Sequence, residues 1–120
     1  MKTYRDLTKK EKELVNEITY QAMSIVENEG CGNEFVRINL YPSAVEAYKK
    51  GEKEVELVGA HYFSNSKWDD IDKYDQVEIF SFEQDPNLED DWKDTYYGEK
   101  WVYESREVIE ETVIDYLFNS

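Results

Sequence analysis

TKKEKELVNEITYQAMSIVENEG, residues 8–30, carries the clearest structural signal in the chain. Apolar side chains recur in it at helical spacing, and these are Leu14, Val15, Ile18, Ala22, Ile25 and Val26. Thr8 and Glu11 have the spacing of a capping box, and Gly30 stands where a C-cap glycine belongs. The stretch therefore predicts an amphipathic helix over residues 9–28.

Three segments after this helix have the pattern of β-strands. They are residues 34–41 (EFVRINLY), 53–63 (KEVELVGAHYF) and 76–83 (QVEIFSFE). Residues 43–50 predict a short helix or turn between the first two strands. The loop between the second and third strands leaves no room for a crossover helix, so we expect these two to pair antiparallel with each other.

The last part of the chain predicts an irregular segment followed by a helix. Residues 84–99 are expected to be irregular, and residues 101–103 (WVY) to form a short edge strand. Ser105 is the expected cap of a final helix over 106–118. The predicted fold class is α+β. We expect residues 1–120 to form a single domain, in which an N-terminal and a C-terminal helix flank a small antiparallel sheet of three to four strands.

Negative charge is concentrated in the second half of the chain. The sequence has 28 acids and 14 bases, a formal net charge of -14. Residues 1–60 hold 11 acids and 9 bases (net -2), whereas residues 61–120 hold 17 acids and 5 bases (net -12). Such a field repels nucleic acid and acidic lipid and attracts basic surfaces. We therefore expect a basic protein partner, no direct nucleic-acid binding and no membrane.

The acidic half is also rich in aromatic residues, which make up 15% of the chain. Acidic disordered tails lack such residues, and rings of this size need burial or a partner. We therefore expect this half to be folded, with its acids on the outside.

Few residues in the chain can carry chemistry. Cys31 is the one cysteine and His61 the one histidine, which excludes an internal disulfide and a site with two histidines. Phosphate-binding, dinucleotide-binding and nucleophile-elbow motifs are missing, and loops starting at Asp72 or Asp85 lack the glycine of an EF-hand. We expect no enzyme activity, cofactor or metal; a Cys31–His61 dyad or an unorthodox cation site at 69–75 stays open.

Neither a membrane span nor a leader is visible. No apolar run approaches the ~18 residues of a membrane helix. The start of the chain, MKTYRDLTKKEKE, is charged throughout. We expect a cytoplasmic protein that is a monomer or a small homo-oligomer.

Two runs interleave acids with rings: WDDID at 68–72 and LEDDW at 88–92. In this, and in length and charge, the chain resembles the small acidic inhibitors of phages and mobile elements known as anti-CRISPR and anti-restriction proteins. The likeness covers residues 66–115 and implies a DNA mimic that blocks a nuclease. Carboxylates ~5–6 Å apart on a helix, or ~6.5 Å apart on a strand, have a spacing similar to that of phosphates.

The expected function is that of a non-enzymatic inhibitor that binds the basic nucleic-acid-binding surface of a bacterial defence nuclease. Eight acids would supply charge and three rings would supply anchors: Asp69, Asp70, Asp72, Asp75, Glu89, Asp90, Asp91, Asp94, Trp68, Trp92 and Tyr96. One alternative is an immunity protein that neutralises a cognate toxin nuclease. Another is a plain acidic domain with an unrecognised cation-binding or enzymatic role.

Overall fold

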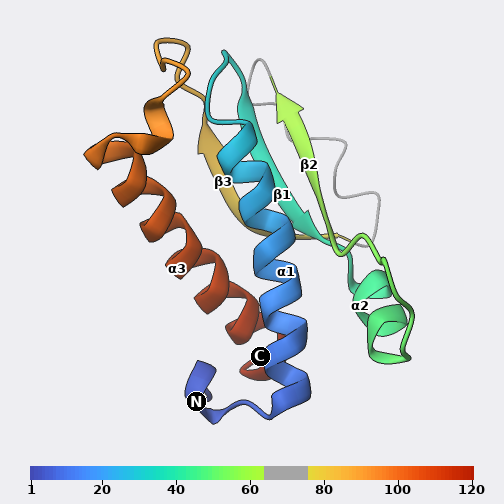
Figure 1. The fold of residues 1–120 in the computed structure, drawn as a ribbon. Coiled ribbons are helices and arrows are strands. Elements are labelled where there is room, and N and C mark those ends of the chain that lie inside the picture. Colours follow the sequence, from blue (N-terminus) through green and yellow to red (C-terminus); the bar gives the residue numbers. More distant parts are fainter. Residues whose placement is uncertain (64–75) are drawn as a thin grey trace.

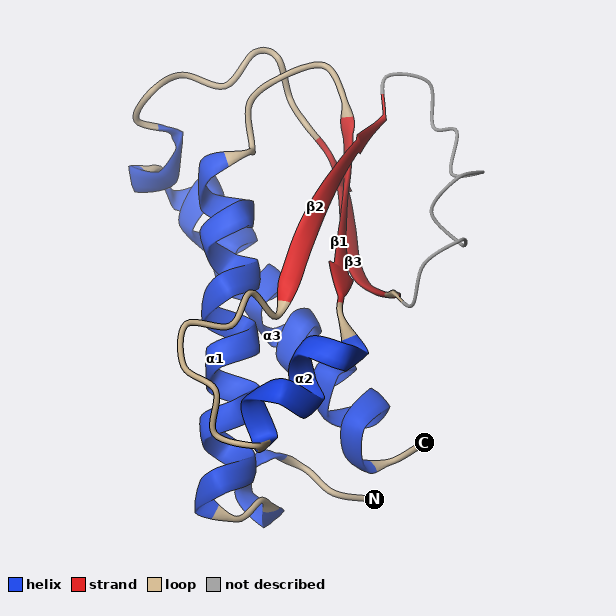
Figure 2. Ribbon diagram, turned by 90° about the vertical axis from the view of Figure 1, so that its right-hand side faces the viewer, coloured by secondary structure: helices blue, strands red, loops and turns tan. Residues whose placement is uncertain are grey.

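In the computed structural model, which describes residues 1–63 and 76–120, two long helices lie across one face of a three-stranded sheet (Figures 1 and 2). The elements in chain order are η1 (Tyr4–Asp6), α1 (Lys9–Asn28), β1 (Phe35–Leu40), α2 (Pro42–Lys49), β2 (Val58–Phe63), β3 (Val77–Glu83), η3 (Trp92–Asp94) and α3 (Tyr96–Phe118). This arrangement confirms the α+β class, with an N-terminal and a C-terminal helix beside an antiparallel sheet.

Strand β1 is the centre of the sheet, whose order is β2-β1-β3. The prediction that the second and third strands pair with each other is wrong, because both pair antiparallel with β1. Val36, for example, lies opposite Tyr62 of β2 and Phe82 of β3. A loop too short for a crossover helix excludes a parallel connection between β2 and β3, but it does not determine which strand each of them pairs with. β1 is instead the partner of both strands, and in this central position its Val36, Ile38 and Leu40 are fully buried.

Helix α1 spans residues 9–28, as predicted. The Thr8 side chain accepts a hydrogen bond from the Glu11 amide (3.2 Å), and the Glu11 carboxylate accepts one from the Thr8 amide (2.8 Å). The buried stripe consists of Leu14, Val15, Ile18, Thr19, Ala22, Met23 and Val26. Full burial of an aliphatic side chain stabilises a fold by about 1.5–3 kcal/mol, so this stripe accounts for much of the core.

Strand β2 begins at Val58, five residues later than the start of the predicted segment 53–63. The residue before β2, Leu57, makes its hydrogen bonds outside the β1–β2 pairing. Its amide donates to the Gln21 side chain of α1 (2.7 Å), and its carbonyl accepts from the Tyr41 amide (2.9 Å). These contacts direct the chain toward α1 and α2 before it enters the sheet.

The predicted edge strand at 101–103 is wrong, because these residues lie inside α3, which begins at Tyr96. Thr95 is the true N-cap, and its hydroxyl oxygen accepts a hydrogen bond from the Gly98 amide (3.1 Å). Ser105, the predicted cap, is buried within the helix. The strand-like composition of 101–103 was overridden by packing of this helix against the sheet and α1.

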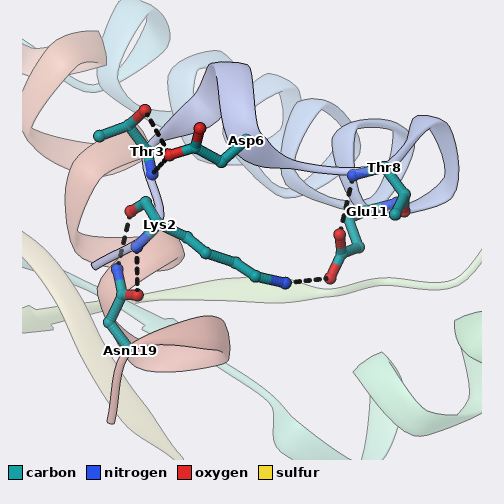
Figure 3. Close-up of polar contacts among 6 residues, drawn as sticks. All are labelled: Lys2, Thr3, Asp6, Thr8, Glu11 and Asn119. Carbon is teal, nitrogen blue, oxygen red and sulfur yellow. Dashed lines mark hydrogen bonds and ion pairs between the residues drawn. The ribbon is translucent and has the colours of Figure 1, made fainter.

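The two ends of the chain meet beside the start of α1 (Figure 3). The Asn119 side chain accepts a hydrogen bond from the Lys2 amide (2.8 Å) and donates one to the Lys2 carbonyl (2.9 Å). The Lys2 ammonium also lies 3.4 Å from the carboxylate of Glu11. This end of the molecule is therefore held by paired polar contacts that include the α1 cap.

We predict that Glu11→Gln reduces the loss of stability in acid. The Thr8 amide is the main cause that lowers the pKa of Glu11, and the Lys2 ammonium lowers it further. A carboxyl whose pKa is lower in the folded state adds stability above its unfolded pKa, and this is lost as the pH falls through the folded pKa. Urea denaturation between about pH 7 and pH 2 should show a shallower decline for Glu11→Gln than for the wild type.

The matched control is Glu13→Gln, which removes an exposed carboxylate from the same helix outside the cap. Its stability should decline with acid as steeply as that of the wild type. Equal slopes for the Glu11 and Glu13 variants would contradict a role for the cap in the pH dependence.

Candidate functional site

One end of the molecule gathers exposed acids around the segment between β3 and α3 (Figure 1). We name this set the acidic end; it consists of Glu83, Asp85, Glu89, Asp90, Asp91 and Asp94. Lys93 is the one base between residues 83 and 94. None of the ion pairs within the described parts of the chain involves these six carboxylates. Within these parts of the chain, no ion pair neutralises their charge.

Further acids from the turn after α1 extend the same negative field. Burial raises the pKa of the Tyr62 hydroxyl at the end of β2, and the Glu29 and Glu34 carboxylates raise it further.

Basic residues lie mainly elsewhere: eight of the 14 lysines and arginines fall within residues 2–12 and 49–53. These two segments lie at the opposite end, near the N-terminus and α2 (Figure 1). Acids lie among these bases, and Glu11 and Glu46 form ion pairs with Lys2 and Lys49, so that end has mixed charge whereas the acidic end has one sign in excess.

Gln84 fastens the start of the acidic end to the turn after α1. Its side chain is almost fully buried and accepts a hydrogen bond from the Glu34 amide (3.0 Å) while donating one to the Glu29 carbonyl (3.0 Å). Its own amide donates to the Glu34 carbonyl (2.9 Å), and the next amide, of Asp85, donates to Gly30 (3.0 Å). Four hydrogen bonds therefore hold this point of the chain.

Stacked rings fasten the other part of the acidic end. Trp92 lies edge-on to Trp101 of α3, with ring centroids 5.7 Å apart, and Trp101 lies edge-on to Phe82 of β3 at 5.4 Å. Trp92 also packs so closely on Gly30 that an added Cβ would lie 2.7 Å from its ring. The carboxylates of 89–94 are consequently carried by an anchored turn.

The structure brings together six of the predicted partner-binding residues at this end: Glu89, Asp90, Asp91, Trp92, Asp94 and Tyr96. The other five, Trp68, Asp69, Asp70, Asp72 and Asp75, lie outside the described residues. Trp92 is half-buried against its own fold, whereas Tyr96 is 72% exposed.

Sequence reasoning missed four residues of this region as site residues: Glu83, Asp85, Tyr97 and Trp101. Tyr97 is 81% exposed, and its ring lies 5.5 Å from that of Tyr96. The doublet Tyr96-Tyr97 was a visible signal for it, whereas Trp101 was hidden by the incorrect strand assignment.

Of the alternative centres for chemistry, the cation site at 69–75 lies outside the described residues, and the Cys31–His61 dyad is not assembled in the structure. The Cys31 thiol faces the Leu88 carbonyl (3.7 Å), and His61 pairs with Arg37 across the sheet, so no contact joins the thiol to the imidazole. Across residues 1–63 and 76–120, no group of three or more His, Cys, Asp or Glu side chains is placed to hold a metal ion. Nor does a helix in these ranges have the length and apolar character to cross a membrane.

Comparison with protein-family models, curated proteins and solved structures finds no match to this chain.

We predict that Gln84→Ala destabilises the protein by about 2–3 kcal/mol, because it leaves the Glu34 amide and the Glu29 carbonyl without their partners. Urea denaturation measures the loss, and hydrogen exchange at the Glu34 amide should accelerate. Asn87→Ala, an exposed change in the same segment, is the control and should stay within about 0.5 kcal/mol of the wild type. Similar stabilities for the two variants would show that Gln84 does not hold this end.

Proposed function

We propose that the protein is a non-enzymatic inhibitor that places its acidic end on the basic nucleic-acid-binding surface of a bacterial defence nuclease. The observation that carries this proposal is the set of six exposed carboxylates on an anchored turn, none of them in an ion pair within the described parts of the chain. A nuclease presents lysines and arginines to bind phosphates, and these would bind the carboxylates instead.

Inhibition of this kind is competition for one surface. Charge of opposite sign speeds the encounter, because the field of the acidic end draws a basic surface toward it. No chemical step and no cofactor is required.

Exposed rings would add contact energy to this electrostatic attraction. Tyrosine is enriched among the residues that contribute most to protein interfaces. Tyr96 and Tyr97 are 72% and 81% exposed at the start of α3, close to Asp94. Trp92 is partly committed to packing on Trp101, so it supports the surface as well as contributing to it.

A cognate toxin nuclease would present the same kind of basic surface. The immunity-protein alternative therefore uses the same residues and differs in the partner alone. A binding panel that includes restriction enzymes, CRISPR effectors and toxin nucleases decides between these partners.

We predict that Asp90→Asn/Asp91→Asn/Asp94→Asn weakens binding to the nuclease partner about tenfold at low salt, mainly through slower association. The difference should shrink as salt rises, because exposed charges are screened over ~10 Å at 0.1 M. Surface plasmon resonance against the panel gives both rates, and displacement of labelled DNA from the nuclease measures competition.

The control is Glu13→Gln/Glu46→Gln/Glu52→Gln, which removes three exposed charges away from the acidic end. It changes the net charge equally and should leave the association rate close to that of the wild type. Equal effects of the two triple variants, or no saturable binding to any member of the panel, would refute the proposal.

A further inference from the structure

A cleft of about 240 Å³ lies at the acidic end, between the last residues of β3 and the first turns of α3. The residues that line it include Glu83, Asp85, Leu88, Trp92, Tyr97 and Trp101. Three of these are aromatic and two are carboxylates, a combination that differs from an ordinary apolar depression.

The aromatic walls of the cleft are positioned before any ligand arrives. The rings of Trp92 and Trp101 meet at an interplanar angle of 61°, and Phe82 supports Trp101 from the sheet. Gly30 leaves room for Trp92, since a side chain there would collide with the ring. Tyr97, which also lines the cleft, is 81% exposed and lies edge-on to Tyr96.

The charge of the cleft selects for a cation. Glu83 and Asp85 are exposed at its wall, and none of the described residues that line it is a lysine or an arginine. Rings attract cations through their faces, and the two carboxylates add ionic hydrogen-bond acceptors. A neutral or anionic guest would leave both carboxylates without a counter-charge.

An organic cation fits these walls better than a metal ion does. Calcium and magnesium need a shell of six or more oxygens, and rings contribute none. A guanidinium is planar and weakly hydrated, stacks on aromatic faces and binds carboxylates through two parallel hydrogen bonds. An ammonium group is more strongly hydrated and lacks the flat face.

We propose that this cleft receives an arginine side chain of the basic partner. The identity of the partner rests on the proposed function, but the preference of the cleft for a guanidinium does not, and it is measurable without any nuclease. The arginine would enter between Tyr97 and the tryptophans, with its guanidinium toward Glu83 and Asp85.

The test is a titration of the ¹⁵N-labelled full chain with the tripeptide acetyl-Gly-Arg-Gly-amide, followed by NMR. The indole N–H signals of Trp92 and Trp101 and the amide of Gly98 should shift in a saturable way. The same peptide with citrulline, which has the shape of arginine without the charge, should bind about tenfold more weakly. The lysine peptide should also bind more weakly than the arginine peptide.

Two variants that remove the same amount of charge test whether the arginine peptide binds in the cleft. Glu83→Gln/Asp85→Asn should weaken the arginine peptide about tenfold, because it neutralises the wall of the cleft. Asp90→Asn/Asp91→Asn removes the same charge from the acidic end outside the cleft, and it should change the affinity less than about twofold. The spectra of both variants also report whether the fold is retained.

Three results would overturn the assignment: no saturable shift with the arginine peptide, equal binding of the citrulline or lysine peptide, or equal effects of the two double variants. Nuclease binding without arginine-peptide binding removes the cleft assignment alone. Arginine-peptide binding without a nuclease partner removes the proposed function and leaves the cleft as a guanidinium site.

Discussion

Strand β1 has hydrogen-bonding groups along two buried edges, and the arrangement of the rest of the chain follows from their need for partners. Buried amides and carbonyls must be paired, so β2 and β3 flank β1 on either side. Both run antiparallel to it, which brings the ends of β2 and β3 to the end where β1 starts. The turn after α1 and the segment before α3 meet there, and that segment carries the acidic end.

The six carboxylates of the acidic end, none of them in an ion pair within the described residues, repel each other, so the segment that carries them needs support from elsewhere. The Gln84 side chain gives this support through its hydrogen bonds to the main chain of the turn after α1. The ring contacts of Phe82, Trp101 and Trp92 give further support from the sheet and α3. The first turn of α3 also favours nearby negative charge, because a helix begins with unpaired amides. In these short segments, the buried side chains hold the structure together and the exposed side chains carry the charge.

The features that were predictable from the sequence depend on residues near one another in the chain. Thr8 and Glu11 cap α1 and its apolar residues lie on one stripe, so its limits were recoverable from local pattern. The neighbours of β1 depend on contacts across the chain, and alternation within each strand does not specify them. Composition indicated an acidic surface, but the cleft joins Glu83, Trp92 and Trp101 only after three separate segments have packed.

Charge and the cleft would contribute differently to recognition. Exposed carboxylates act over a distance of ~10 Å and speed the approach of any basic surface, but every nucleic-acid-binding protein presents such a surface. Attraction alone therefore gives little discrimination and weakens with salt. A cleft that receives one guanidinium acts only at contact and requires an arginine at one position of the partner. On these proposals, the carboxylates of 89–94 govern how fast a partner arrives, and the cleft beside them governs which partner stays bound.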